Sequence, residues 1–240
     1  MKSLGRTIIS ASLALLITFL SSCQATGQIV ETGIEVMARN NFDLLQGKRV
    51  GLVTNPTGVD RNLRSTVDII NSAPGVKLTA LYGPEHGVRG EFPAGEYVES
   101  ETDHSTGLPV YSLYGKTRKP SPEMLNNIDI LVYDIQDIGS RSYTFISTLG
   151  LLMEAAAEKG IPVVVLDRPN PLGGIKMEGV VTRPGFFSFV SQFAIPYIHG
   201  MTVGELAMFL NGEGMLANGI RCDLHVVKMN GWSRKMMFEE

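Results

Sequence analysis

The sequence predicts an α/β fold with a largely parallel sheet and helices on both faces. Short apolar runs lie near residues 50, 78, 131 and 164, and helical patterns separate them. This alternation is typical of parallel strands joined by crossover helices, because each helix returns the chain to the same edge of the sheet. Each run also stops at a polar loop. If the four runs share one sheet, these loops meet at its carboxyl edge.

The first half of the mature chain contains five predicted elements. Residues 30–45 carry apolar side chains at helical spacing, which predicts an amphipathic helix. The apolar run at residues 50–53 predicts a strand, and residues 63–73 predict the crossover helix after it. Residues 76–82 predict the second strand. The stretch at residues 92–115 has no strong helical period, so we expect a long excursion over the sheet edge, with room for a short hairpin.

The second half supplies the remaining elements: a strand at residues 128–132, a helix at 145–159, a strand at 161–166, a helix at 203–210 and a strand at 224–227. Gly160 follows the first of these helices and predicts its end. Thr202 and Glu205 have the spacing of a capping box, which predicts the start of the second helix. Residues 173–189 are rich in glycine and aromatic residues and predict no regular element.

Residues 1–22 predict a lipoprotein signal peptide. Lys2 and Arg6 form a basic start, and residues 8–20 are mostly apolar but too few for a stable membrane span. The Leu-Ser-Ser-Cys ending resembles the bacterial lipobox, which implies cleavage before Cys23 and a lipid on its thiol. The alternative is an ordinary signal peptide with an incidental cysteine.

We therefore expect an extracytoplasmic protein, anchored in a bacterial membrane through Cys23. Gln24 after the cysteine, in place of aspartate, resembles the sorting signal for the outer membrane, where the protein would face the periplasm. Residues 23–45 are expected to form a tether and the N-terminal helix. Cys222, the other cysteine, is expected to be a small buried hydrophobe, since a lipidated partner leaves no intramolecular disulfide.

Composition excludes several classes of function. A formal net charge of -3 gives no electrostatic basis for nucleic-acid binding. The chain lacks a glycine-rich dinucleotide fingerprint, a P-loop, a nucleophile elbow and an H-E-x-x-H zinc motif. We expect no cofactor. A metal site formed by His86, Asp134 and Asp137 is an alternative, although the spacing of these residues matches no metal-binding motif.

Polar residues follow the first four predicted strands: Asn55, then Glu85 and His86, then Asp134, Gln136 and Asp137, then Asp167, Arg168 and Asn170. A single such residue is commonly a helix cap, but four converging loops predict a pocket. Carboxylates with amide and guanidinium donors suit a polyhydroxylated ligand and acid/base work on a glycosidic bond.

Four motifs in order carry a specific resemblance: residues 51–58 (GLVTNPTG), 83–87 (GPEHG), 133–141 (YDIQDIGSR) and 166–171 (LDRPNP). Together they resemble the exo-β-N-acetylmuramidase family typified by NamZ. The resemblance implies a Rossmann-like catalytic domain followed by a smaller C-terminal domain. It also implies a glycosidase that releases N-acetylmuramic acid from the non-reducing ends of peptidoglycan fragments. Residues 46–240 would then be an incomplete catalytic domain without its C-terminal partner, and two alternatives stay open: a non-catalytic muropeptide- or sugar-binding lipoprotein, or an inactive truncated copy.

Glu85 is our candidate for the general acid, because glycines and a proline shape a tight loop around it. Asp134 or Asp137 would raise its pKa and serve as the second catalytic carboxylate. Alternatively, Glu85 only accepts hydrogen bonds from its loop, and a retaining, inverting or substrate-assisted mechanism remains open. The lactyl carboxylate of a muramyl group is a natural target for Arg141 or Arg168. The complete set of candidate substrate-binding residues is Asn55, His86, Gln136, Arg141, Tyr143, Arg168, Asn170 and His199.

Overall fold

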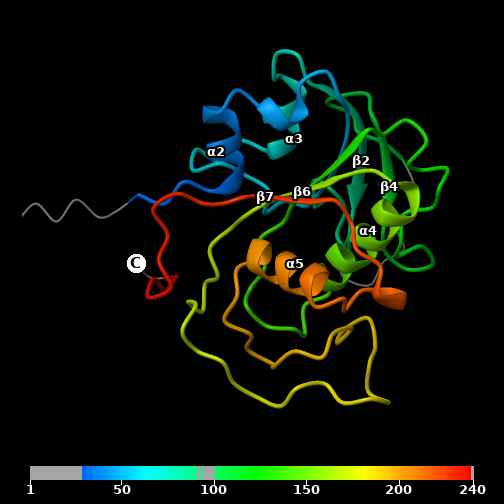
Figure 1. Ribbon diagram of the computed structural model, residues 1–240. Helices are drawn as coiled ribbons and strands as arrows, with labels where there is room; N and C mark the ends of the chain where they lie inside the picture. Colours follow the sequence, from blue (N-terminus) through cyan, green and yellow to red (C-terminus); the bar gives the residue numbers. More distant parts are fainter. Residues whose placement is uncertain (1–28, 91–92, 94–100, 239–240) are drawn as a thin grey trace, which may run out of the picture.

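The computed structural model describes residues 29–90, 93 and 101–238 (Figure 1). The predicted signal peptide and Cys23 lie outside these residues, and so does most of the start of the predicted excursion. Within the described part of the chain, no helix combines the length and apolar character needed to cross a bilayer.

Seven strands form one sheet in the order β3-β4-β2-β1-β5-β6-β7. They are β1 (Arg49–Thr54), β2 (Lys77–Gly83), β3 (Glu101–Thr102), β4 (Pro109–Ser112), β5 (Ile130–Asp134), β6 (Val163–Leu166) and β7 (Leu224–Val227). All neighbours pair in parallel except the short β3, which pairs antiparallel with β4. The prediction that the first four apolar runs share one sheet is therefore confirmed, and β3 with β4 supplies the short hairpin.

Helices cover both faces of the sheet, as predicted (Figure 1). Helices α2 (Gly33–Arg39) and α3 (Thr66–Asn71) lie on one face, and α4 (Phe145–Lys159) and α5 (Val203–Gly212) lie on the other. Each pair has its own apolar core: Ile34 and Ile70 belong to one cluster, and Leu152 and Leu206 to the other. Alternate side chains of the central strands point to opposite faces, so both cores draw on the same strands.

Two predicted helices are shorter than the sequence suggested. The helix expected at residues 30–45 ends at Arg39, and only a 3-10 turn (Asp43–Leu45) follows it. Asn41 and Phe42 both adopt left-handed backbone angles with φ of 54°, which interrupts a right-handed helix. The helix expected at residues 63–73 starts only at Thr66, because Leu63 also has a positive φ and Ser65 caps the first turn.

Helix ends with clear local signals were predicted correctly. Helix α4 ends at Gly160, whose φ of 73° places it in the left-handed region that favours glycine. Helix α5 begins with the capping box, in which the Thr202 side chain accepts from the Glu205 N–H and the Glu205 side chain accepts from the Thr202 N–H. Cys222 is buried, as expected, and burial raises the pKa of its thiol to about 11.

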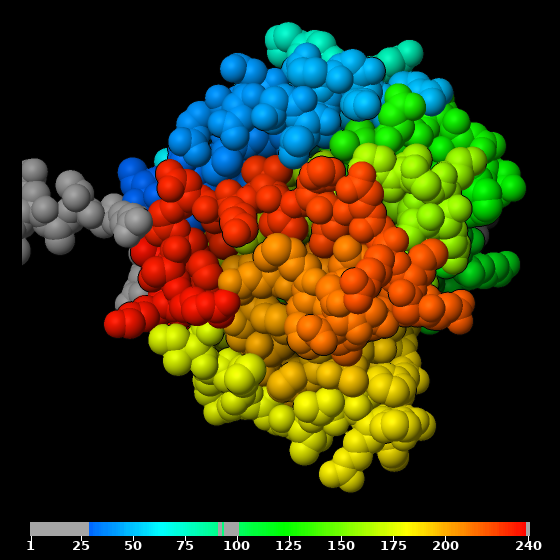
Figure 2. Space-filling model, viewed as in Figure 1, coloured from blue at the N-terminus to red at the C-terminus, as the bar shows by residue number. Residues whose placement is uncertain are grey.

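The order of the strands places a topological switch point between β1 and β5. From β1 the chain proceeds to β2 and β4 on one side, then crosses to β5, β6 and β7 on the other. In open parallel sheets, ligands bind in the crevice outside the carboxyl ends of the strands at such a point. The long segment between β6 and α5 contains no helix or strand and runs below α5 in Figures 1 and 2, coloured yellow to orange.

Candidate functional site at the carboxyl ends of the strands

The loops after β1 and β5 are tied together at the switch point. The Thr54 hydroxyl donates to the backbone oxygen of Asp134 at 2.8 Å, where the two strands are still in register. One step further on, the backbone N–H of Gln136 donates to the Thr57 hydroxyl at 2.9 Å. Thr57 in turn donates to the side-chain oxygen of Asn55 through both its N–H and its hydroxyl. Asn55 and Gln136, both predicted as substrate-binding, therefore share one rigid framework.

Asp134 and Arg168 meet in a buried ion pair. Arg168 donates from Nε to Asp134 Oδ1 at 2.6 Å and from Nη2 to Oδ2 at 2.9 Å. Nη2 also donates to the Val59 carbonyl, and the Thr66 hydroxyl donates to Asp134 Oδ2 in a short hydrogen bond. Burial disfavours the charged guanidinium, but the Asp134 carboxylate outweighs burial and raises the pKa of Arg168. The structure thus joins these two candidates to each other, with no exposed oxygen on Asp134.

Asp137 lies in the same loop but is less fully bonded. Its Oδ2 accepts from the Gly139 N–H at 2.8 Å, whereas Oδ1 is buried without a hydrogen-bond partner among the described residues. His199 Nε2 lies 3.2 Å from Oδ2, although the geometry does not make a hydrogen bond. His199 Nδ1 accepts from the Met201 N–H, so a neutral ring carries its proton on Nε2, facing Asp137. Of the two candidate second carboxylates, Asp137 is the one with an unpaired oxygen.

The loop after β6 holds the two remaining amides in place. Gln136 Nε2 donates to the carbonyls of Asp137 and Pro169, both at 2.6 Å. Asn170 donates to the Met201 carbonyl and accepts from the Leu172 N–H. A side chain at Gly139, whose φ is 80°, would overlap the Asn170 amide. The glycine is therefore required for the β5 loop to approach the β6 loop this closely.

Glu85 and His86 follow β2, on the other side of β1. Both are half-buried, and His86 adopts a φ of 74°, which is unusual for a residue with a side chain. The Tyr114 hydroxyl hydrogen-bonds to Glu85, and this bond raises the pKa of Tyr114. Tyr114 is a contact that the sequence pattern missed, because it lies in the loop after β4. The strained backbone beside Glu85 fits a functional loop.

Arg141 and Tyr143 lie further along the β5 loop and are more exposed. Arg141 Nη1 donates to the carbonyls of Val180 and Ile195, and its guanidinium lies over the Tyr197 ring at 5.7 Å. Its Nε and Nη2 have no partner within the described chain. Tyr143 is 48% exposed. Between the two candidate partners of a lactyl carboxylate, Arg141 is accessible and Arg168 is already paired.

Two cavities open near the ends of β5 and β6. The larger one has a volume of about 490 Å³ and is lined by Gln136, Asn170, Ile138 and Pro169 on the strand-end side. The C-terminal segment forms its other wall through Trp232, Met236, Met237 and Phe238. Sequence analysis missed this wall, because an apolar segment without a helical or strand period gives no sign of where it packs. Arg234 fixes the segment by donating to the carbonyls of Gly174 and Gly200 and to the Glu205 carboxylate.

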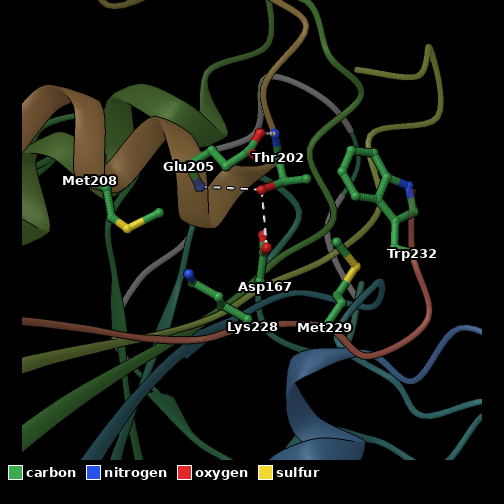
Figure 3. A pocket seen from close by; sticks show the side chains of 7 residues that line it. All are labelled: Asp167, Thr202, Glu205, Met208, Lys228, Met229 and Trp232. Atoms are coloured by element: carbon green, nitrogen blue, oxygen red, sulfur yellow. Dashed lines mark hydrogen bonds between the residues drawn. The ribbon is translucent and has the colours of Figure 1, made fainter. Parts of the chain in front are cut away.

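The smaller cavity, of about 170 Å³, lies beside the start of α5 (Figure 3). Asp167 is at its base, where Oδ2 accepts from the Thr202 hydroxyl and Oδ1 accepts from the Gly204 N–H. Burial raises the pKa of Asp167, partly offset by these hydrogen bonds. Glu205, Met208, Lys228, Met229 and Trp232 complete the lining. Asp167 serves here as an anchor for α5, in keeping with the cap that such residues often provide.

The site therefore consists of a carboxylate beside β2, a buried carboxylate with one unpaired oxygen after β5, two oriented amides and one accessible arginine. Its chemistry is that of proton transfer and hydrogen bonding to a polar ligand. Among the residues that the structure describes, no group of three or more histidine, cysteine, aspartate or glutamate side chains is arranged to hold a metal ion.

A mostly parallel sheet with helices on both faces and polar loops at its switch point defines an α/β protein of Rossmann-like architecture. The chain belongs to the exo-β-N-acetylmuramidase NamZ family, since the model of that family's N-terminal part matches residues 50–240. The resemblance drawn from the four motifs is confirmed.

Named relatives agree with this assignment. Over 211 residues the chain is 56% identical to the peptidoglycan β-N-acetylmuramidase NamZ of Bacillus subtilis (strain 168). The aligned region covers 88% of this chain and 50% of the relative. A DUF1343 family protein from Bacteroides fragilis NCTC 9343 has a crystal structure with 64% identity and a TM-score of 0.82, covering 88% of this chain and 52% of that one. A second such protein from the same organism has 35% identity and a TM-score of 0.76, covering 87% and 54%. The chain thus spans about half the length of the relatives it matches.

Proposed function

We propose that this chain carries the catalytic part of a glycosidase that releases N-acetylmuramic acid from the non-reducing ends of peptidoglycan fragments. The observation that supports the proposal is the order of the strands, in which Glu85 follows β2 and Asp137 follows β5, the two neighbours of β1 at the switch point. The name of the B. subtilis relative supports the same reaction. Because the chain spans half of that relative, the activity of the whole protein is part of the proposal.

Glu85 would protonate the leaving oxygen, and Asp137 would act on the opposite face of the sugar. Strands β2 and β5 both adjoin β1, so their ends lie about two strand spacings, or roughly 10 Å, apart. Carboxyl groups separated by roughly 6.5–9.5 Å leave room for a water molecule and favour inversion, whereas retention requires about 5–5.5 Å. NMR of the first sugar released distinguishes the two, since inversion of a β-linkage yields the α-anomer.

The test is Glu85→Gln, which keeps the shape of the side chain and removes its proton. The assay measures the release of N-acetylmuramic acid from a disaccharide of N-acetylmuramic acid and N-acetylglucosamine. Both this chain and a fusion carrying the second half of the B. subtilis relative are assayed. Loss of a general acid lowers the rate about 10²–10⁴-fold. The matched control is Glu213→Gln, at the exposed C-cap of α5; if Glu85→Gln and the control retain equal rates, Glu85 only stabilises its loop.

A sugar-binding lipoprotein is the second candidate. The engagement of Asp134 with Arg168 favours it, because this carboxylate is then unavailable for catalysis while the neighbouring amides stay oriented for binding. Such a protein would bind muramyl saccharides at equilibrium without any turnover, even in the fusion. Calorimetric titration together with the release assay distinguishes a binding protein from an enzyme.

We also propose that the protein is extracytoplasmic and anchored through a lipid on Cys23, with the outer membrane as its destination. The support is the lipobox-like sequence before that cysteine. Cys23→Ala should move the protein from the membrane fraction to the soluble fraction, with Cys222→Ala as the control. Retention of the Cys23→Ala protein in membranes would contradict a lipid anchor.

A further inference from the structure

Asn55 occupies a central position at the carboxyl edge of the sheet. It follows β1 directly, and β1 lies between β2 and β5 at the point where the strand order reverses. The residue is only 5% exposed. A polar side chain this deeply buried is expected to have its hydrogen-bonding groups satisfied.

The orientation of the Asn55 amide follows from its neighbours. One atom of the amide lies 3.0 Å from the Thr57 nitrogen and 2.5 Å from the Thr57 hydroxyl. The Thr57 N–H can only donate, so that atom must be the acceptor, Oδ1. The Thr57 hydroxyl accepts from the Gln136 N–H at 2.9 Å, which leaves its own proton for Asn55. Two donors therefore fix the oxygen of the amide on the side of Thr57.

Nδ2 must consequently point away from Thr57. It has no hydrogen-bond partner among the described residues. It is also not one of the unpartnered polar atoms that are completely buried, so solvent reaches it. The loop around it is tight, since the Gly58 N–H donates to the Asn55 carbonyl and a side chain at Gly58 would overlap the Thr54 hydroxyl. The loop after β1 therefore holds a pre-oriented donor, whose complement is an acceptor oxygen on a ligand.

We propose that Thr57 is a positioning residue for the Asn55 amide, and that Asn55 Nδ2 binds a carbonyl or carboxylate oxygen of the muramyl group. This rests on the proposed function for the identity of the sugar. N-acetylmuramic acid offers two such acceptors, the acetamido carbonyl and the lactyl carboxylate. In this proposal Thr57 acts through Asn55.

The orientation can be tested without any ligand. Thr57→Val removes the hydroxyl and keeps the shape of the side chain, whereas Thr57→Ser keeps the hydroxyl. The side-chain amide signal of Asn55 in ¹H–¹⁵N NMR spectra, assigned by its loss in Asn55→Asp, should shift in Thr57→Val and stay in place in Thr57→Ser. An unchanged signal in Thr57→Val, or equal shifts in both variants, overturns the positioning role.

Binding tests the second part. The three probes are N-acetylmuramic acid, muramic acid without the acetyl group, and N-acetylglucosamine without the lactyl group. We expect N-acetylmuramic acid to shift the Asn55 amide signal and to bind about tenfold more weakly to Thr57→Val, as loss of one neutral hydrogen bond implies. Thr57→Ser should bind like the unmodified chain, and Asn55→Asp, which replaces the donor by an oxygen, should bind least.

The probes also identify the acceptor. A response to N-acetylglucosamine and not to muramic acid assigns the acetamido carbonyl, and the reverse assigns the lactyl carboxylate. If none of the three moves the Asn55 signal, the ligand assignment is overturned. Release of N-acetylmuramic acid from the disaccharide with an unmoved Asn55 signal overturns this inference alone, whereas a shifted signal without release, even in the fusion, overturns the proposed hydrolysis alone. Thermal unfolding of each variant verifies that it is folded.

Discussion

Asp134 and Arg168 form a two-pronged ion pair in the interior of the protein, and this pair joins the ends of β5 and β6. The Nε–Oδ1 and Nη2–Oδ2 distances are 2.6 and 2.9 Å, so the planar guanidinium matches the carboxylate edge to edge. Arg168 also binds the loop after β1, because its Nη2 donates to the Val59 carbonyl. Two residues that the sequence placed in the site therefore hold three strand-end loops in register.

The first prediction concerns the cost of breaking this pair. Asp134→Asn leaves the Arg168 guanidinium buried without a counter-charge, and we expect a loss of about 3–5 kcal/mol in the free energy of unfolding. Urea denaturation followed by circular dichroism measures it. Asp134→Asn combined with Arg168→Met should be less destabilised than the single variant, because no uncompensated charge remains. A single variant as stable as the unmodified chain would show that the pair contributes nothing to stability.

The second prediction concerns the docking of α2. A methyl group at Gly33 would overlap the backbone nitrogen of Asp167 and lie 2.6 Å from the Leu166 Cα. Gly33→Ala must therefore push α2 away from β6, and we expect a loss of about 2–4 kcal/mol, as for severe overpacking of a core. Gly212→Ala, in α5, is the control, because its methyl group meets nothing within 4 Å among the described residues. The melting temperature should fall clearly in Gly33→Ala, whereas in Gly212→Ala it should stay unchanged or rise.

The third prediction is a dependence of stability on pH. Arg89 donates to both oxygens of Asp103, which, with Thr106, lowers the pKa of Asp103 from 3.8 to about 2. A lowered pKa means that this carboxylate stabilises the fold above about pH 4 and that the contribution is lost as the pH falls toward 2. Asp103→Asn should therefore lose on the order of 1 kcal/mol near neutral pH, since solvent screens part of the pair. The difference in unfolding free energy between the variant and the unmodified chain should shrink as the pH falls from about 4 toward 2.

Unfolding free energies measured from pH 2 to 7 provide this comparison. Asp43→Asn is a suitable control, because Asp43 is exposed and forms no ion pair among the described residues. A constant difference between Asp103→Asn and the unmodified chain over the whole range would contradict the lowered pKa.

The sequence predicted the strands of the sheet, the end of α4 and the start of α5, because the signals for these features are local. Gly160 and the Thr202–Glu205 capping box act within one helical turn, so their effect does not depend on the rest of the fold. The early end of α2 was not predictable in this way. Asn41 and Phe42 adopt left-handed angles in the structure, and a phenylalanine gives no sign of such a conformation in a sequence.

The sequence predicted that the candidate site lies at the strand ends. It did not predict which of the site residues pair with one another. Whether Asp134 faces a ligand or an arginine depends on the register of β5 against β6, which brings together residues 34 positions apart. Thr57 was missed because a threonine in a turn is ordinary; its importance comes only from the pairing of β1 with β5. Tertiary register decides both cases, and no single segment encodes it.

The last prediction concerns Asp137 as the second catalytic carboxylate. Asp137→Asn keeps an oxygen that accepts from the Gly139 N–H, so the loop and the melting temperature should change little. The negative charge is lost, and with it the group that would activate a water or stabilise a developing positive charge on the sugar. We expect the turnover of the disaccharide to fall about 10²–10⁴-fold with little change in KM, as for removal of an acid or base that acts only in the transition state.

His199→Gln provides the comparison for this variant. Because His199 Nε2 lies 3.2 Å from the Asp137 carboxylate, its replacement should perturb the orientation of Asp137 and reduce turnover less than Asp137→Asn does. If Asp137→Asn retains full turnover in the fusion that carries the second half of the B. subtilis relative, Asp137 is a loop residue. A substrate-assisted mechanism or another carboxylate would then replace it, since Asp134 is already paired with Arg168.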